Sequence, residues 1–244
     1  MIGLPDTIKA VLFDLDGVLT GTADLHRAAW KATFDEFLRT RDGDAFVPFT
    51  DRDYAEFVDG RPRADGVRTF LASRGIRLPE GSPDDPPSAE TVNGIGNRKN
   101  ELVQKLIAEK GVAPYPGSMR YLHAVREAGL PIGVVTSSAN GAAVLAAAKL
   151  TPLIQALIDG NVLAKEGLRG KPAPDSFLAG ARAVDVSPAQ AAVFEDALAG
   201  VQAGRAGNFG YVVGVNRANQ ADALREHGAD IVVDDLAELL EGND

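Results

Sequence analysis

Short apolar runs without polar alternation recur along most of this chain. They cover residues 10–13, 132–136, 191–194, 211–215 and 231–233, with a further short one near Leu157. A continuous apolar run of this length is typical of a strand buried on both faces of a parallel sheet. Helical segments separate the runs, through Val144 and Leu145, after Pro174 and over 198–205. This alternation predicts an α/β fold with a doubly wound, Rossmann-like parallel sheet.

The strand rhythm stops after Thr20 and resumes near Pro131, and a helical period replaces it. Asp24 is expected to cap a first helix, whose apolar side is formed by Trp30, Phe34, Phe37 and Leu38. A second helix is expected after Arg63, and a third from about Asn97. The sequence therefore predicts a helical insert within the α/β domain.

Two short turns bound this insert. Residues 20–22 open it, and the proline-containing segment 114–117 closes it, so both crossings are hinge candidates. Inside the insert, the proline-rich polar segment 79–88 predicts a surface loop without regular structure. We expect an α/β domain over 1–21 and 114–244, and a helical domain over 22–113.

Composition narrows the classes of function. A chain of 244 residues with 45% hydrophobic side chains can bury a sizeable core. Its formal net charge of −9 disfavours nonspecific attraction to nucleic acid or to an anionic membrane. The absence of cysteine excludes disulfides, a thiol nucleophile and cysteine-ligated zinc, whereas oxygen-ligated cations remain.

The opening residues favour a cytoplasmic location. They carry Asp6 and Lys9, and the apolar stretch that follows is interrupted at Asp14. That stretch is too short for the core of a signal peptide or for a membrane span. We expect a cytoplasmic monomer with neither nucleic acid nor membrane as a partner.

Two carboxylates, Asp14 and Asp16, directly follow the first apolar run. Residues at i and i+2 of an extended chain point the same way, so both acids share one side. Their repulsion raises one pKa unless a cation offsets it, which favours a divalent metal. A calcium loop requires a ligand and a glycine where Val18 and Leu19 stand. Taken alone, the pattern is most often a solvated turn.

Other polar groups follow the remaining strand runs. They comprise Thr136, Ser137, Ser138 and Asn140 after one run, Lys171 in a proline-rich turn, and Glu195 with Asp196 after another. Each alone is ordinary, as a helix cap, a surface lysine or a turn. Each of them, however, falls at the carboxyl end of a predicted parallel strand or in the loop after it, where such sheets bind ligands. Together they favour phosphoryl transfer through an aspartyl phosphate.

Four blocks of the chain resemble one family. The segments F-D-L-D-G-V-L-T, V-V-T-S-S, G-K-P-A-P-D-S-F and F-E-D-A-L-A-G-V-Q-A are similar, in order and spacing, to the motifs of the haloacid dehalogenase superfamily, with its β-phosphoglucomutase-like branch most similar. The resemblance covers essentially the whole chain. It implies a Rossmann-like core with the insert as a helical cap, and Mg²⁺-dependent phosphoryl transfer.

The resemblance also implies roles for the core residues. Asp14 would be the nucleophile, and Asp16 the general acid and base, whose backbone carbonyl also binds Mg²⁺. The carboxylates of Asp14 and Asp196 would hold the metal, with Glu195 close by. Thr136 and Lys171 would bind the phosphoryl oxygens.

Further residues match substrate contacts of the family. In the cap, Arg63 would hold a second phosphate, and the remaining matches are His26, Arg98, Lys99 and Asn100. In the core they are Ser137, Ser138 and Asn140. The chain departs from the family pattern at Gly21, Asn97 and Ala139, where an aspartate and two lysines are usual.

The expected substrate is a small phosphosugar. The first expectation is a β-phosphoglucomutase activity that converts β-glucose 1-phosphate to glucose 6-phosphate. A sugar-phosphate phosphatase is the nearest alternative, because the missing charge at Ala139 weakens the binding of a bisphosphate. A haloacid dehalogenase is a weaker alternative. From another class, a noncatalytic phospho-accepting switch stays open.

Overall fold

The computed structural model describes residues 2–241, which divide into two compact units. One unit combines the chain up to Gly21 with the chain from Val112 onward, and the other is Thr22–Gly111. The first crossing therefore lies between residues 21 and 22. The second lies between 111 and 112, two residues before the boundary that the sequence predicts.

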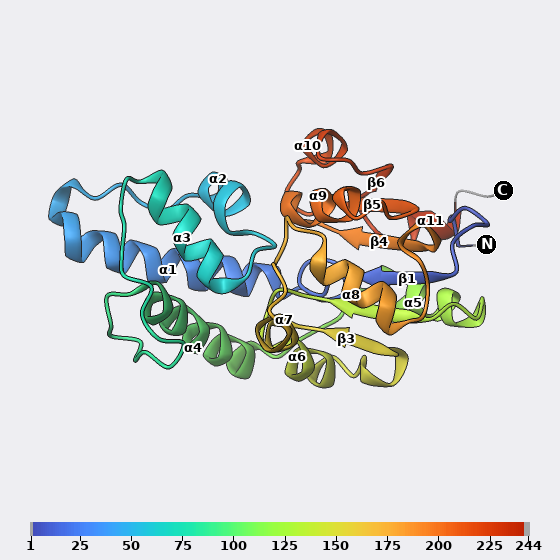
Figure 1. Ribbon diagram of the computed structural model, residues 1–244, viewed down its shortest axis with the longest axis horizontal. Coiled ribbons are helices and arrows are strands. Elements are labelled where there is room, and N and C mark those ends of the chain that lie inside the picture. Colours follow the sequence, from blue (N-terminus) through green and yellow to red (C-terminus); the bar gives the residue numbers. More distant parts are fainter. Residues whose placement is uncertain (1, 242–244) are drawn as a thin grey trace. The chain divides into compact units, whose positions relative to one another are not determined.

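The first unit is built on a six-stranded parallel sheet with the order β3-β2-β1-β4-β5-β6. Its strands are β1 (Ala10–Phe13), β2 (Ile132–Val135), β3 (Ala156–Ile158), β4 (Ala191–Glu195), β5 (Tyr211–Val215) and β6 (Ile231–Val233). Figure 1 shows the strands side by side among the helices of this unit. The doubly wound parallel sheet is confirmed, and β4 extends one residue further than predicted.

Helices cover both faces of this sheet. Leu12 and Phe13 are neighbours on β1, so their side chains point to opposite faces. Leu12 belongs to a buried cluster with Phe177 of α8 (Asp175–Ala183), whereas the Phe13 ring packs edge-on against Tyr121 of α5 (Pro116–Glu127), with centroids 6.2 Å apart. The remaining helices of the unit are α6 (Gly141–Ala147), α7 (Gly160–Glu166), α9 (Leu198–Ala206), α10 (Ala221–Glu226) and α11 (Glu238–Glu241), with short 3-10 turns at Thr151–Leu153 and Pro188–Gln190.

The register aligns the carboxyl ends of the central strands. Phe13 pairs with Phe194 and with Val134, so β1, β2 and β4 end at one edge of the sheet. The ladder continues one residue beyond β1, where Asp14 N donates to Phe194 O at 2.9 Å. Polar residues that follow these strands therefore emerge together.

The second unit is helical, as expected. It contains α1 (Ala23–Asp42), α2 (Asp51–Asp53), α3 (Arg63–Ser73) and α4 (Val92–Lys110), with a 3-10 turn at Gly43–Ala45 and a π-helical turn at Tyr54–Val58. The predicted apolar side of α1 is buried. The ring centres of Phe34 and of Phe70 on α3 lie 4.3 Å apart. The segment 79–88 has no regular structure, in agreement with its composition.

Two helix starts differ from the sequence prediction. Asp24 does not cap α1, because the helix begins at Ala23 and Thr22 occupies the cap position, two residues before the predicted one. Asp24 lies in the first turn and pairs with Arg27. Helix α4 begins at Val92, five residues before Asn97, because the Thr91 side chain accepts a hydrogen bond from Gly94 N at 2.9 Å and so caps it.

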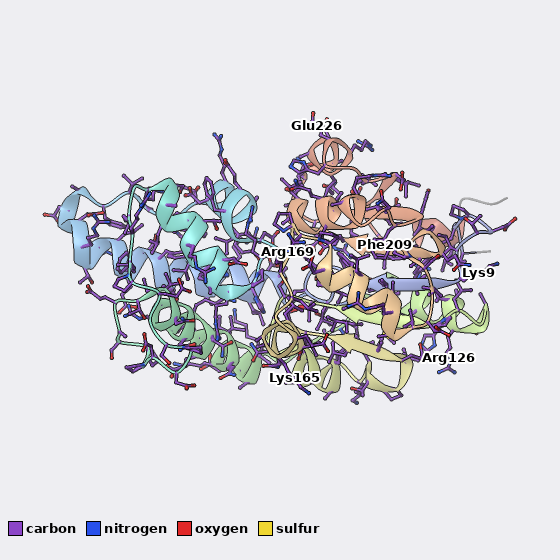
Figure 2. The ribbon with its side chains drawn as sticks, in the orientation of Figure 1. Lys9, Arg126, Lys165, Arg169, Phe209 and Glu226 are labelled. Atoms are coloured by element: carbon purple, nitrogen blue, oxygen red, sulfur yellow. The ribbon has the colours of Figure 1, made fainter. Side chains whose placement is uncertain are left out.

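Charged side chains cover the surface of the first unit. Figure 2 labels exposed ones, such as Lys9, Arg126 and Glu226, together with the buried Phe209. Over residues 2–241, no helix combines the length and the apolarity that a membrane crossing requires.

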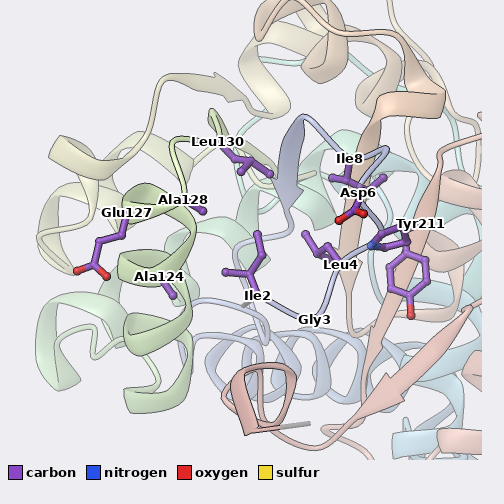
Figure 3. A pocket seen from close by; sticks show the side chains of 11 residues that line it. Ile2, Gly3, Leu4, Asp6, Ile8, Ala124, Glu127, Ala128, Leu130 and Tyr211 are labelled. Atoms are coloured by element: carbon purple, nitrogen blue, oxygen red, sulfur yellow. The ribbon is translucent and has the colours of Figure 1, made fainter. Parts of the chain in front are cut away.

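A hollow of about 730 Å³ lies at the amino end of the sheet (Figure 3). It is lined by the segment 2–6 and Ile8, by the end of α5, and by Leu130 and Tyr211. None of the predicted site residues lines this hollow.

Candidate active site

Three carboxylates meet at the carboxyl ends of β1 and β4. Asp14, Glu195 and Asp196 are buried, and each places a carboxylate oxygen within 4.8 Å of the others. Asp14 follows β1, Glu195 ends β4, and Asp196 follows it. The parallel pairing of the two strands thus unites acids that are far apart in the sequence.

A buried lysine joins two of these acids. Lys171 Nζ lies 2.5 Å from Asp14 Oδ1 and 2.5 Å from Glu195 Oε1, and it also donates to Val135 O at 3.1 Å. Its side chain is fully buried, and its Nζ lies 4.8 Å from the centre of the Phe177 ring. The alternative interpretation of Lys171 as a solvated surface lysine is therefore wrong.

Burial shapes the ionisation of this cluster. It raises the pKa of the Asp14 carboxyl well above its ordinary value, and repulsion from Glu195 and Asp16 adds to this effect while Lys171 opposes it. Burial by itself lowers the pKa of Lys171, but attraction to Asp14 and Glu195 reverses the effect and leaves that pKa raised. Lys171 is thus held as a cation.

The charges and donor atoms of the cluster fit a divalent cation. Three carboxyl groups and one ammonium, that of Lys171, meet in this buried place, and buried acidic groups of this kind are commonly paired with cations or coordinate metals. The donors are all oxygen, which suits Mg²⁺ better than softer metals. Glycine at position 17 keeps the cluster compact, because a Cβ there would lie 1.9 Å from Asp196 Oδ2.

The two oxygens of Asp14 have different surroundings. Oδ1 accepts from Lys171, whereas Oδ2 has no hydrogen-bond partner among residues 2–241. Both oxygens of Glu195 are engaged, because Oε2 also accepts from Ala197 N at 2.9 Å. Asp14 therefore has an oxygen available for attack, while Glu195 mainly holds Lys171.

Thr136 and Asp16 also come together. The Thr136 hydroxyl donates to Asp16 Oδ2 at 3.3 Å and accepts from Ser138 N at 3.1 Å. Thr136 is buried, and Asp16 is half-buried. The residues predicted to carry the core chemistry thus form one continuous group.

Residues at the start of α7 hold the loop after Thr136 through hydrogen bonds to its carbonyl groups. Ser138 O accepts from Gly160 N at 3.0 Å, and the carbonyl of Ala139 accepts from Asn161 Nδ2 at 2.8 Å. Asp159 accepts from Asn161 N and Val162 N, both at 3.0 Å, and so caps α7. Ser137, Ser138 and Asn140 lie half-buried in this loop. The supporting residues 159–161 are absent from the sequence prediction.

In the helical unit, His26 and Lys99 are brought together. Lys99 Nζ lies 2.9 Å from His26 Nδ1 and 4.8 Å from the centre of the Trp30 ring. Lys99 is buried, and the next residue on α4, Asn100, is half-buried. Arg98 has a local contact instead, because its Nε donates to Pro87 O at 2.8 Å and so fixes the irregular loop.

Arg63 begins α3 and makes no ion pair with any residue between 2 and 241. Burial lowers the pKa of its guanidinium. Its side chain lies against Gly96 of α4, where a Cβ would approach Arg63 Cγ to 3.0 Å. The helical unit thus contains a partly buried cation without a protein counter-ion.

Comparisons with known proteins find relatives that match nearly the whole chain. A model of the haloacid dehalogenase-like hydrolases matches residues 8–208. A β-phosphoglucomutase of Mycobacterium tuberculosis is 57% identical, over 98% of this chain and 94% of its own. A validoxylamine A 7′-phosphate phosphatase of Streptomyces hygroscopicus subsp. limoneus is 33% identical, over 95% of both chains. The crystal structure of a β-phosphoglucomutase from Clostridium difficile has a TM-score of 0.74 and 26% identity, over 95% of this chain and 93% of its own.

Proposed function

The chain belongs to the haloacid dehalogenase-like hydrolase family, in its β-phosphoglucomutase-like branch, and we propose that it transfers a phosphoryl group of a small phosphosugar through an aspartyl phosphate on Asp14. The observation that carries this proposal is the buried group of Asp14, Lys171, Glu195 and Asp196 at the carboxyl edge of the sheet. The favoured activity is that of a β-phosphoglucomutase, from β-glucose 1-phosphate to glucose 6-phosphate.

In the first step, Asp14 acts as the nucleophile. Its Oδ2 forms a bond to phosphorus while the bond between phosphorus and the donor oxygen breaks. Asp16 gives its proton to the leaving oxygen and later takes a proton from the acceptor hydroxyl. The Thr136 hydroxyl, which donates to Asp16 Oδ2 at 3.3 Å, orients this acid. The phosphoryl group then leaves Asp14 for the acceptor.

Lys171 keeps Asp14 reactive. A neutral carboxyl is a poor nucleophile, and burial favours that neutral form. The ammonium 2.5 Å from Asp14 Oδ1 favours the charged form and screens it from Glu195. The same ammonium and the Thr136 hydroxyl supply positive groups for the phosphoryl oxygens.

Mg²⁺ is the cofactor we propose for this site. The side chains of Asp14 and Asp196 and the backbone carbonyl of Asp16 would hold it, with Glu195 close by. When bound, Mg²⁺ neutralises charge on the phosphoryl oxygens and on the carboxylates. The three carboxylates of the buried cluster, whose oxygens lie within 4.8 Å of one another, support this proposal.

Substrate binding is assigned to two groups of residues. From the α/β unit we propose Ser137, Ser138 and Asn140. From the helical unit we propose Arg63 for a second phosphate, with His26, Arg98, Lys99 and Asn100 as further contacts. The guanidinium of Arg63 lacks a counter-ion in the described chain, which supports this assignment. Guanidinium groups bind phosphate through two parallel hydrogen bonds.

Phosphatase activity is the second candidate. It is supported by the lack of a charged side chain at the exposed Ala139, and by a relative of 33% identity that is a phosphatase. The two activities differ in whether water reaches the aspartyl phosphate before the bisphosphate reorients.

One assay separates these activities. The enzyme is incubated with Mg²⁺, β-glucose 1-phosphate and a trace of glucose 1,6-bisphosphate, and glucose 6-phosphate and inorganic phosphate are measured. A mutase forms glucose 6-phosphate at a rate that depends on the bisphosphate. Release of inorganic phosphate without glucose 6-phosphate establishes the phosphatase instead.

A further inference from the structure

The loop after β5 holds the backbone of the active site through an arginine. Arg217 Nε donates to Gly17 O at 2.8 Å, and its Nη1 donates to Asp234 O at 2.8 Å. The guanidinium carbon lies 3.9 Å from the centre of the Tyr115 ring. Two hydrogen bonds and one stacking contact therefore fix the plane of this guanidinium.

Arg217 acts on the peptide that follows the proposed acid, Asp16. Gly17 N donates to Thr20 O at 2.8 Å, so both polar groups of this glycine are engaged. Gly17 also has φ +93, and a Cβ built on it would lie 1.9 Å from Asp196 Oδ2, so its backbone packs closely against that carboxylate. A shift of Gly17 would therefore move Asp16 and Asp196 together.

The same loop contacts the second acidic segment. Gln220 Nε2 donates to the backbone carbonyl of Asp196 at 2.9 Å. Gln220 N in turn donates to Asn216 Oδ1 at 2.7 Å, which closes the loop on itself. One loop of five residues thus holds both segments that carry the proposed metal ligands.

We propose that Arg217 is a positioning residue of the metal site, acting through Gly17 on Asp16 and Asp196, with Gln220 as its partner. The inference rests on the proposed function, because it assigns Arg217 to the Mg²⁺ site of that reaction. Partners that orient metal ligands typically change metal affinity by about 10- to 100-fold when they are substituted.

The test uses Arg217→Lys in the full chain, because lysine keeps the charge but cannot form both hydrogen bonds and the stack. Mg²⁺ affinity is measured by isothermal titration calorimetry with the metal alone, and the melting temperature is measured without metal. We expect Mg²⁺ to bind about tenfold more weakly. The melting temperature without metal should change by only a few degrees, and kcat should fall more than KM rises.

Arg205→Lys is the matched control. Arg205 also grips a backbone carbonyl, that of Gly228, through Nε and Nη2 at 3.0 and 2.7 Å, but it contacts none of the site residues. This control should keep the wild-type affinity for Mg²⁺. Gln220→Ala supplies a second variant if Arg217→Lys does not fold, and it should also weaken Mg²⁺ binding.

Mg²⁺ affinity within twofold of wild type in both Arg217→Lys and Gln220→Ala would overturn the inference. The proposed function is judged separately, by the activity of the unaltered enzyme. An inactive wild-type protein whose Mg²⁺ affinity depends on Arg217 would contradict only the function. An active one whose variants bind and turn over normally would contradict only the role of Arg217.

Discussion

Lys171 and Asp14 are 157 positions apart in the sequence, yet Lys171 Nζ lies 2.5 Å from Asp14 Oδ1 in a buried pair. The same ammonium reaches Glu195, so one cation links the ends of β1 and β4. This arrangement supports the proposed role of Asp14 as the nucleophile, and its consequences can be measured.

Asp14→Asn should abolish turnover and leave the fold intact. The amide keeps the shape of the side chain but cannot form an acyl phosphate. Product formation and the circular dichroism spectrum are compared with those of Asp222→Asn, the same change at an exposed site of α10. Turnover retained in Asp14→Asn would remove Asp14 from its role.

Asp16→Asn should slow the proton-transfer steps far more than it weakens metal binding. General acid and base catalysis contributes about 10²- to 10⁴-fold, and we expect a loss of kcat in that range. The substitution retains the backbone carbonyl proposed as a ligand, so Mg²⁺ affinity by calorimetry should change little. A large loss of affinity with an unchanged kcat would contradict the assignment.

Lys171→Met should destabilise the metal-free protein. Removal of one partner from a buried ion pair leaves uncompensated charge and costs about 3–5 kcal/mol. Urea unfolding in the presence of a chelator measures the loss, with the exposed Lys165→Met as the control. Glu195→Gln in the Lys171→Met background should recover part of the stability. A loss as small as that of the control would show that the pair has no such effect.

The stability of the metal-free enzyme should depend on the ionisation of Asp14. Because burial raises its pKa in the folded state, the folded protein retains a proton that the unfolded chain has already released. Stability from this group is thus lost as pH rises from the ordinary aspartate pKa towards the raised one. Relative to Asp14→Asn, wild type should lose stability across this interval, as followed by urea unfolding. If the unfolding free energies of wild type and Asp14→Asn changed in parallel with pH, this result would contradict the raised pKa of Asp14.

Arg63→Ala should weaken the binding of glucose 1,6-bisphosphate more than that of a monophosphate. A hydrogen bond to a charged group contributes about 1.5–3 kcal/mol, so a loss of roughly tenfold or more is expected. Arg68→Ala is the control on the same helix, since Arg68 already pairs with Asp65 and Glu80. Equal losses for both phosphosugars would argue against a second phosphate site at Arg63.

The central strands of the sheet were predictable because every residue of β1, β2 and β4 is buried, as expected of strands covered on both faces. Each consists almost entirely of apolar residues, which makes the runs visible in the sequence. Glu195 is the exception. This residue extends β4 beyond the apolar run, and its carboxylate is buried in an ion pair with Lys171. The pairing of Asp14 with Lys171 depends on tertiary contacts, so spacing alone could not give it.

The sequence prediction omits α5 and the first residues of α4, whose buried faces contain small or polar residues. The buried side of α5 includes Gly117 and Ser118, and the Ser118 hydroxyl donates to Val18 O at 2.7 Å. In the same way, the start of α4 contains the buried Gly94 and Gly96, and a search for apolar spacing does not detect them. Arg217 is also absent from the sequence prediction, although it follows a strand predicted to end at the edge that carries the site.

The most direct test identifies the residue that carries phosphorus. The enzyme is mixed with Mg²⁺ and β-glucose 1,6-bisphosphate, quenched in acid and reduced with borohydride, which converts an aspartyl phosphate to homoserine. Peptide mass spectrometry then locates the change. We expect homoserine at Asp14 alone, whereas a label on another residue, or no acyl phosphate during active turnover, would contradict the proposed role of Asp14.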